Sequence, residues 1–292
     1  MPESSGTTVG IVIPVHNRRE LTLQCLRSLS RVLLDNLAVR IFVIDDGSTD
    51  GTASAIAEEY PDVVVIRGDG NLYYTAATNL GIEAAIAAGS EFIVCMNDDS
   101  IVHEAFIERL LNIARTEPRA ILGGLLLRWD RPHEVYQCGP VWRTLKGGWV
   151  WPPATPAWSV RRPVWPVEFL AGNCLLIPRQ AITEAGKMDD ARFPQYGDAE
   201  FSPRLKRLGW KLLIASDAYV WVEPNRVSSL HKMGVRQALR RLFRDPYSSQ
   251  NLKHNFLKAW VSAPTRVEGV LAFCVLLARM LVRGLQVCFA AE

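Results

Sequence analysis

Two pairs of adjacent aspartates stand directly behind apolar runs that are typical of buried strands. Asp98-Asp99 follows the run 92–95, and Asp45-Asp46 follows the run 39–44. Because ligands of open α/β sheets collect at the carboxyl ends of the strands, both pairs are expected at one edge of one sheet. Neighbouring carboxylates repel each other unless a cation or a hydrogen-bonding ligand offsets their charge. The pattern favours a divalent metal ion with substrate phosphates in its shell, and a solvated turn with a capping Asp is the alternative.

The elements that would position these aspartates alternate between strand and helix patterns. Strand patterns cover 9–15, 39–44, 62–66, 91–96 and 120–127, and helix patterns cover 19–34, 52–60, 75–88 and 103–115. This rhythm predicts an α/β fold, with a mostly parallel, twisted, Rossmann-like sheet and flanking helices. Beyond residue 167 the patterns predict a strand, two helices, and short strands at 210–215 and 218–222. Residues 226–292 are predicted as a helical extension.

A segment rich in Pro, Gly and Trp interrupts this rhythm at 141–166. It is predicted as a long loop, and loops of this length in compact domains are usually functional or mobile. Its tryptophans are Trp142, Trp149, Trp151, Trp158 and Trp165. Their indole rings could stack on a sugar, sit in a membrane interface, or pack into a dimer or the core, and the sequence leaves these alternatives open.

The composition is that of a globular protein with an uneven distribution of charge. At 292 residues, of which 49% are hydrophobic and 22% charged, the chain can bury a full core. The net charge is +3, but residues 226–292 hold 11 Lys and Arg against 3 Asp and Glu, so this extension carries +8 and the first 225 residues about −5. A basic extension favours contact with an anionic surface such as phospholipid headgroups. No zinc-finger or RNA-recognition signature accompanies the charge, so we expect no nucleic acid partner.

The extension also contains a candidate amphipathic helix. One helical face is apolar, with Val235, Ala238, Leu239, Leu242 and Phe243, and the other is basic, with Arg236, Arg240, Arg241 and Arg244. This pattern predicts binding to a membrane surface, with a helix packed on the domain as the alternative. The later apolar run 270–277 is interrupted by Arg279 and Arg283, and it is too short for a span of ~20 residues. Peripheral attachment is the most that the extension predicts.

The cysteines and the first residues predict the compartment. The six cysteines are scattered without metal-ligand spacing, and residues 1–8 are polar and lack the pattern of a signal peptide. The expected location is the reducing cytoplasm, with peripheral attachment to the inner face of the plasma membrane as the membrane-bound option.

Several motifs, in order along the chain, carry a resemblance to a known enzyme family. They are IVIPVHNR at 11–18, VIDDGSTDG at 43–51, GNLYYTAATNLG at 70–81, NDD at 97–99, AGNCLLIPR at 171–179 and GDAE at 197–200. Together they resemble family 2 glycosyltransferases with the GT-A fold, in the version seen among bacterial rhamnosyltransferase-like members. The similarity spans residues 8–225, which divide into a nucleotide-binding half at 8–100 and an acceptor-side half at 101–225.

The resemblance implies an inverting reaction, in which an acceptor hydroxyl displaces a nucleoside diphosphate from the anomeric carbon of a sugar. The donor would be a UDP- or dTDP-sugar, with dTDP-rhamnose as a candidate, and the acceptor a glycan or lipid-linked intermediate of cell-surface polysaccharide. Asp46 would accept a hydrogen bond from the imide N–H of uracil or thymine, His16 would stack on the base, and Asp98 would contact the ribose or donor sugar. The predicted donor-binding set is completed by Pro14, Asn17, Arg18, Gly47 and Asn79.

The resemblance also assigns a base and a metal site. Asp198 is the candidate general base, a role that typically contributes ~10²–10⁴-fold in rate, and Glu200 is the runner-up or a supporting acceptor-site residue. Asp99 is the first choice as ligand of Mn²⁺ or Mg²⁺, which would act as a Lewis acid on the leaving diphosphate. The family's usual Asp-X-Asp has Asn97 in its first place here, its Glu-Asp reads Gly197-Asp198, and the segment 220–225 lacks its His. Glu223 or His231 is the candidate replacement ligand. The structural alternative for Asp198 and Glu200 is stabilisation of a helix N-terminus.

Two other functions stay open at this level. A sugar nucleotidyltransferase would also use a nucleotide-binding sheet and paired acids, but it needs a Gly-rich loop with Arg or Lys after the first strand, which residues 14–18 do not supply. A catalytically degenerate binding subunit would keep the fold and recruit a partner through the Trp-rich segment and the basic extension. The sequence does not determine the oligomeric state, a homodimer included.

Overall fold

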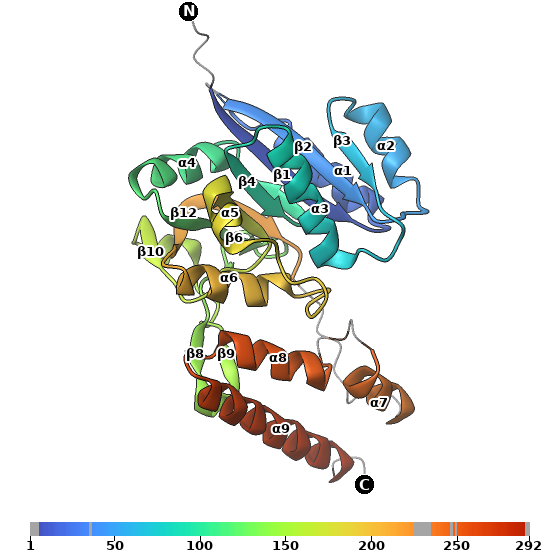
Figure 1. The fold of residues 1–292 in the computed structure, drawn as a ribbon, viewed down its shortest axis with the longest axis vertical. Helices are drawn as coiled ribbons and strands as arrows, with labels where there is room; N and C mark the ends of the chain where they lie inside the picture. The colour runs from blue at the N-terminus through green and yellow to red at the C-terminus, as the bar shows by residue number, and fades with distance from the viewer. Residues whose placement is uncertain (1–5, 35–36, 225–234, 246–247, 249, 290–292) are drawn as a thin grey trace, which may run out of the picture.

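The computed structural model describes residues 6–34, 37–224, 235–245, 248 and 250–289. Its first half is a regular alternation of strands and helices that closely follows the predicted rhythm (Figure 1). The elements are β1 (Thr7–Val15), α1 (Arg19–Leu29), β2 (Leu37–Asp45), α2 (Thr52–Glu59), β3 (Val64–Arg67), α3 (Tyr73–Ala87) and β4 (Phe92–Met96). The helix predicted at 19–34 therefore ends earlier, at Leu29.

The second half is less regular and contains many short elements. They are β5 (Ser100–Val102), α4 (Phe106–Thr116), β6 (Ala120–Arg128), β7 (Val135–Gln137), β8 (Val141–Arg143), η1 (Thr144–Lys146), β9 (Gly148–Val150), η2 (Ala157–Ser159), β10 (Val164–Pro166), β11 (Cys174–Pro178), α5 (Arg179–Ala185), α6 (Gly197–Arg207) and β12 (Lys211–Val222). The Trp-rich segment is thus not one long loop, because it holds the β8–β9 hairpin and strand β10. The two strands predicted at 210–215 and 218–222 are one strand, β12, whose register shifts between Ala215 and Tyr219.

The main sheet has the path β10-β12-β6-β11-β4-β1-β2-β3, with β5 paired to β12 and β7 paired to β6. Strands β3, β2, β1 and β4 are parallel neighbours. Strand β11 is antiparallel to both β4 and β6, so β6 and its parallel partner β12 run in the same direction as β4. The predicted α/β fold with a mostly parallel sheet is confirmed. The carboxyl ends of β1, β2 and β4 therefore meet at one edge, where the two aspartate pairs stand.

Both faces of the sheet are covered, which explains why its strands are apolar at consecutive positions. Ile11 and Ile13 of β1 pack with α1, α2 and α4 on one face, and Val12 packs with α3, α5 and α6 on the other. Helix α3 approaches the sheet closely at Gly81, where an added Cβ atom would lie 2.2 Å from a methyl carbon of Val12. The small residues of α3 thus set the distance between this helix and the sheet.

The described part of the extension is helical, as predicted, and consists of α7 (Val235–Phe243), α8 (Leu252–Ser262) and α9 (Arg266–Phe289). Figure 1 shows α8 and α9 side by side beyond α6, with the β8–β9 hairpin against them. Ser262 Oγ donates a hydrogen bond to the Ala199 carbonyl (3.1 Å) and Arg207 donates to the Val261 carbonyl (2.8 Å), which ties α8 to α6. Trp142 of the hairpin packs with Ala259 and Ala272, so these helices share a small core with the Trp-rich segment.

Helix α7 leaves part of its apolar face uncovered. The side chains of Leu239 and Phe243 are 50% and 65% exposed. Ala238 and Leu242 of the same face are half-buried, so the apolar face of α7 is partly packed and partly exposed. Over the residues that the structure describes, no helix combines the length and the hydropathy that a membrane span requires.

Candidate active site

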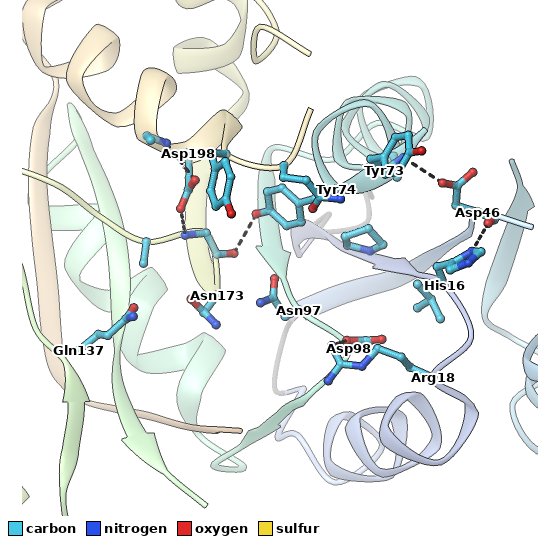
Figure 2. A pocket seen from close by; sticks show the side chains of 18 of the residues that line it. His16, Arg18, Asp46, Tyr73, Tyr74, Asn97, Asp98, Gln137, Asn173 and Asp198 are labelled. Atoms are coloured by element: carbon cyan, nitrogen blue, oxygen red, sulfur yellow. Dashed lines mark hydrogen bonds and ion pairs between the residues drawn. The ribbon is translucent and has the colours of Figure 1, made fainter. Parts of the chain in front are cut away.

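A cavity of about 740 Å³ opens at the carboxyl edge of β1, β2 and β4 and extends to the start of α6 (Figure 2). From residues 8–100, its lining includes Pro14, His16, Arg18, Asp46, Gly70, Tyr73, Tyr74, Asn97 and Asp98. From residues 101–225, the lining includes Gln137, Trp151, Phe169, Gly172, Asn173, Gln195, Tyr196 and Asp198, and the extension contributes Lys258. One cavity thus joins the strand-end aspartates to the candidate base.

The loop after β1 is fixed to the loop after β2. The Nδ1–H of His16 donates to the Asp46 carbonyl at 2.5 Å, and its Nε2 accepts from the Asn17 amide at 3.0 Å. Asn17 has φ of 53°, a conformation that Asn tolerates better than most residues, and its Oδ1 accepts from the Thr49 N–H at 2.7 Å. Asn17 does not line the cavity, so its role in the structure is to hold this loop, whereas His16 presents its ring to the cavity.

The Asp45-Asp46 pair divides between two tasks. Asp45 Oδ1 accepts from the Ser48 N–H at 3.0 Å and caps the turn, as one alternative predicted. Asp46 lines the cavity, and its two carboxylate oxygens accept from the N–H groups of Gly70 (2.8 Å) and Tyr73 (2.9 Å). Gly47 has φ of 70°, and an added Cβ atom would lie 3.0 Å from the Gly70 backbone, so no side chain fits there. Asp46 is thereby held rigidly, with remaining lone pairs available to a ligand.

The Asp98-Asp99 pair faces the guanidinium of Arg18. Arg18 lies 3.0 Å from Asp98 Oδ1, 3.2 Å from Asp99 Oδ2 and 3.4 Å from Glu223 Oε2. Burial raises the pKa of Asp98 to about 7, against the opposing effect of Arg18, and burial likewise raises the pKa of Asp99. Three carboxylates thus surround the guanidinium of Arg18, and this one positive charge offsets only part of their negative charge.

The fit of this cluster to a divalent metal ion rests on its oxygen atoms. Within the described ranges, no group of three or more His, Cys, Asp and Glu side chains is arranged to hold a metal by itself. Asp99 Oδ1, however, is buried and has no hydrogen-bond partner, which is costly for a carboxylate oxygen. Carboxylate oxygens are the ligands that Mg²⁺ and Mn²⁺ take when substrate phosphates complete their shell. Asp99 therefore fits a metal ligand, Glu223 lies beside it, and His231 falls outside the described residues.

Asp198 stands in the first turn of α6, at the other end of the cavity from Asp46 and Asp98 (Figure 2). Its Oδ2 accepts from the Gly172 N–H at 2.9 Å, and its Oδ1 accepts from the Ala199 N–H at 2.9 Å. The Tyr74 hydroxyl donates to the Gly172 carbonyl at 3.3 Å, which joins α3 to the same loop. Burial raises the pKa of Asp198 above its ordinary value of 3.8. The carboxylate is aimed and partly desolvated, as a general base requires.

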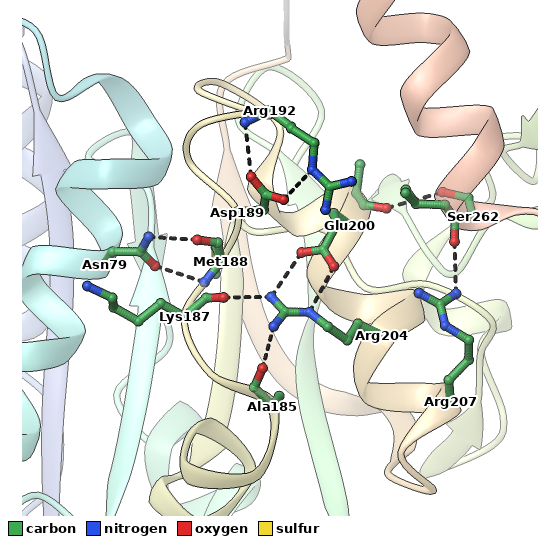
Figure 3. Close-up of polar contacts among 12 residues, drawn as sticks. Asn79, Ala185, Lys187, Met188, Asp189, Arg192, Glu200, Arg204, Arg207 and Ser262 are labelled. Carbon is green, nitrogen blue, oxygen red and sulfur yellow. Dashed lines mark hydrogen bonds and ion pairs between the residues drawn. The ribbon is translucent and has the colours of Figure 1, made fainter.

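Like Asn17, Gly47, Asp99 and Glu223, the predicted site residues Glu200 and Asn79 lie outside the cavity lining. Figure 3 shows the polar contacts of these last two side chains. Glu200 is buried in an ion pair with Arg204, with an Nε to Oε1 distance of 2.8 Å. Asn79 uses its side-chain amide to bond both backbone groups of Met188, at 2.9 and 3.0 Å. Both side chains hold the segment between α5 and α6 in place. Their geometry supports a structural role rather than the predicted contacts with acceptor and donor.

The tryptophans of the Trp-rich segment have different environments, which correspond to different alternatives that the sequence left open. Trp151 lines the cavity and packs edge to face on Phe169, with ring centroids 6.1 Å apart. Trp142 and Trp149 pack against each other, at 5.4 Å, beside the extension, and Trp158 is 72% exposed. One tryptophan is therefore placed to stack on a ligand, and others serve packing.

Lys258 is a cavity residue that no motif indicated. It lies on α8, and its ammonium sits 4.3 Å from the ring centroid of Tyr196. Gln137 of β7 is also unanticipated, and its Oε1 is a buried acceptor without a partner. Neither residue belongs to a patterned motif, so only the folded chain brings them to the site.

The fold and this strand-end site define a GT-A-type protein. A crystal structure of GalNAc-T7 with UDP, GalNAc and Mn²⁺ is similar, with a TM-score of 0.61 and 17% identity, and the match covers 90% of this chain and 52% of that one. A crystal structure of S. aureus TarS residues 1–349 in complex with UDP has a TM-score of 0.57 and 12% identity, and covers 90% of this chain and 68% of that one. At these identities the likeness establishes the fold alone.

Sequence comparisons identify the family. The model of glycosyl transferase family 2 matches residues 10–151. The N-acetylglucosaminyl-diphospho-decaprenol L-rhamnosyltransferase of Mycobacterium tuberculosis is 33% identical over 202 residues, a match that covers 62% of this chain and 66% of that relative. The chain belongs to glycosyl transferase family 2. It spans slightly less than two thirds of the length of this curated relative.

Proposed function

We propose that this protein is an inverting glycosyltransferase that transfers a sugar from a UDP- or dTDP-sugar to a hydroxyl of a lipid-linked glycan. The observation that carries the proposal is the single cavity with Asp46 and Asp98 at one end and the half-buried carboxylate of Asp198 at the other. The name of the Mycobacterium tuberculosis relative supports rhamnose as the sugar and a diphospholipid-linked N-acetylglucosamine as the acceptor. This reaction would be a step in the synthesis of a cell-surface polysaccharide.

At the donor-sugar end, Asp46 recognises the nucleotide base. The remaining lone pairs of its carboxylate accept a hydrogen bond from the imide N–H of uracil or thymine. Cytosine lacks this proton and is selected against. His16, fixed through Nδ1 to the Asp46 carbonyl, presents its ring for stacking. Asp98 would bond ribose or sugar hydroxyls, and Pro14 and Arg18 line the same cavity.

The reaction also requires positive charge beside the leaving diphosphate. Asp99, with Glu223 beside it and His231 beyond the described residues, would hold Mn²⁺ or Mg²⁺. Such an ion supplies Lewis-acid stabilisation of the leaving diphosphate. Arg18 already lies between Asp98, Asp99 and Glu223, so its guanidinium adds a further positive charge at this end.

At the acceptor end, Asp198 takes the proton of the attacking hydroxyl as the new glycosidic bond forms. The oxygen attacks the anomeric carbon from the face opposite the leaving diphosphate, and the bond to the diphosphate oxygen breaks, so the configuration inverts. The two backbone N–H groups that bond Asp198 keep its carboxylate oriented, and Trp151 and Phe169 offer aromatic faces to the acceptor sugar.

The basic extension is the element that would hold the enzyme at its substrate. An acceptor with a prenyl tail resides in a bilayer, and the exposed apolar and basic residues of α7 suit the anionic inner face of the plasma membrane. Peripheral attachment of a cytoplasmic enzyme is the arrangement that we propose.

Nucleotide-dependent thermal stabilisation tests the donor site directly. A ligand that binds only the folded state raises the melting temperature, so UDP- and dTDP-sugars should raise it more than GDP- or CMP-sugars. The shift should increase with Mn²⁺ in the wild type and lose this metal dependence in Asp99→Asn. No shift with any nucleotide would overturn the proposal and favour a degenerate binding subunit, whereas synthesis of a nucleotide-sugar from a sugar phosphate would favour a nucleotidyltransferase.

A further inference from the structure

Lys258 brings a positive charge from the extension to the acceptor end of the cavity. It lies on α8, outside both the family-matched residues and the predicted motifs, and lines the cavity with Tyr196 and Asp198. Its ammonium stacks over the Tyr196 ring at 4.3 Å from the centroid. Because α8 is bonded to α6 through Ser262 and Arg207, the position of Lys258 relative to Asp198 is fixed by the fold.

Among the residues that the structure describes, Lys258 has no ion-pair partner. Arg18, the other lysine or arginine that lines the cavity among the described residues, contacts three carboxylates. Lys258 makes no ion pair within 4.0 Å and no hydrogen bond to any described residue, and both Asp198 oxygens already accept backbone N–H groups. Burial lowers the pKa of Lys258 to about 8, and the nearby charge of Asp198 opposes this only in part.

A partly desolvated ammonium that forms no ion pair with any described residue, at the wall of a substrate cavity, is suited to an anionic ligand. The anion of the donor belongs at the opposite end, because Arg18 and Asp98 lie across the cavity from Asp198 (Figure 2). The anion that reaches Lys258 must then belong to the acceptor.

We propose that Lys258 binds a phosphate of the acceptor, in the linker that joins the acceptor sugar to its lipid. This inference rests on the proposed glycosyltransferase function and adds a determinant of acceptor specificity to it. The enzyme would thereby prefer a sugar carried on a diphosphate over the same sugar without one. The ammonium gives the phosphate a charge-assisted hydrogen bond, and the acceptor hydroxyl is presented to Asp198 in the same contact.

The experiment compares two acceptors and four proteins. The acceptors are N-acetylglucosamine linked through diphosphate to a short prenyl chain, and the octyl glycoside of the same sugar. The proteins are the wild type, Lys258→Met, Lys258→Arg, and Lys253→Met as the matched control, since Lys253 is an exposed residue of the same helix. Thermal stabilisation by donor nucleotide shows that each variant is folded and retains its donor site.

We expect Lys258→Met to raise KM for the diphosphate acceptor roughly 10- to 100-fold, the loss that one hydrogen bond to a charged group implies. Its KM for the octyl glycoside should be unchanged, Lys258→Arg should restore most of the preference, and Lys253→Met should match the wild type. A lysine that acts only through the charge of Asp198 would instead change the rates with both acceptors by the same factor, which would overturn the proposal.

The remaining outcomes are also decisive. If the wild type does not use the glycoside as a substrate, the test is the KM for the diphosphate acceptor alone. Equal KM values for Lys258→Met and Lys253→Met would then contradict phosphate binding by Lys258. Preference of the wild type for the glycoside would also contradict it. If the wild type glycosylates neither acceptor with any UDP- or dTDP-sugar, the proposed function itself fails. Transfer with no effect at Lys258 leaves the proposed function intact and removes only this inference.

Discussion

Asp198 contributes to the folding of helix α6 and is also the proposed general base. An Asp in the first turn of a helix is favourable to that helix, which is the structural alternative that the sequence allowed. In the structure its oxygens accept one N–H from its own helix and one from the loop at Gly172. The second bond is what fixes the carboxylate at the cavity, and helix stabilisation alone would not require it.

Removal of the Asp198 charge tests the assignment of the base. We expect Asp198→Asn to lower kcat by ~10²–10⁴-fold, the typical contribution of a positioned general base. Binding of the donor nucleotide, measured by thermal stabilisation, should persist because Asp198 lies at the other end of the cavity. The control is Asp190→Asn, at an exposed position before the same helix. Wild-type turnover in Asp198→Asn would remove Asp198 from the mechanism.

The pH dependence of the rate reports on the same carboxylate. Burial raises the pKa of Asp198 above 3.8, and Lys258 lowers it. Since the base must be ionised, kcat/KM should fall on acidification at a higher pH than an exposed aspartate would give. Loss of the ammonium in Lys258→Met should move this acid limb to still higher pH, whereas Lys258→Arg should not. Tyr74, whose pKa burial raises well above 10, stays neutral throughout this range.

The measurement is a profile of kcat/KM against pH with the uncharged octyl glycoside, so that phosphate binding at Lys258 plays no part. An acid limb at the same pH in the wild type and Lys258→Met would show that the two charges do not interact.

At the scale of elements, the regular first half could be predicted from sequence, because each strand and helix carries its own periodic signal. The strand β5 has three residues and gives no such signal, and β12 was predicted as two strands because its register shift interrupts the pattern. The short strands within 141–166 depend on partners distant in the sequence, such as the pairing of β10 with β12.

The site residues likewise include some that local sequence patterns predict and some that depend on distant partners. The strand-end position of Asp46 and Asp98 could be predicted because the carboxyl ends of parallel strands coincide. The directions of Glu200 and Asn79 could not, because each is set by a partner, Arg204 or Met188, that only the tertiary structure supplies. Lys258 required the docking of a helix from outside the domain.

The packing of α3 on the sheet gives a prediction in which two effects have opposite signs. Helix propensity alone would make Gly81→Ala stabilising by about 1 kcal/mol. An added Cβ atom, however, would lie 2.2 Å from Val12 and 3.1 Å from Ile44, both within the core. Overpacking of this kind costs ~1–3 kcal/mol, so we expect a net loss of stability in chemical denaturation.

The control for this prediction is the double variant Val12→Ala with Gly81→Ala. Removal of the Val12 methyl groups relieves the contact, so the two changes should be less destabilising together than the sum of their separate effects. Additive effects, or a stabilising Gly81→Ala, would show that the helix can move away from the sheet without cost.

At the scale of the whole molecule, net positive charge is concentrated on the extension, which also exposes large apolar side chains. The extension carries +8 and the first 225 residues about −5. Leu239 and Phe243 of α7 and Val267 of α9, which is 77% exposed, are large apolar side chains on the extension that face solvent. The same extension brings Lys258 to the cavity. We therefore expect one structural unit both to attach the protein to a bilayer and to present a lipid-linked acceptor to Asp198.

Binding to vesicles tests this arrangement. The wild type should bind vesicles that contain anionic lipid and not vesicles of neutral lipid, and the binding should weaken as salt screens the charges. Arginines near an anionic surface contribute roughly fivefold each to binding, so replacing Arg236, Arg240 and Arg244 together by Gln should weaken it by roughly 100-fold. Co-sedimentation at several salt concentrations measures both effects.

The matched control is a second triple variant, in which Arg27, Arg31 and Arg40 are replaced by Gln. These arginines are exposed on the catalytic body, so the net charge of the chain falls equally while the extension is unchanged. If attraction depends only on net charge, both triple variants lose binding equally. If the extension is the attachment site, the body variant binds as the wild type does. In that case the triple variant of Arg236, Arg240 and Arg244 should also transfer sugar poorly to an acceptor embedded in vesicles. It should transfer sugar normally to the soluble octyl glycoside, because its cavity is intact.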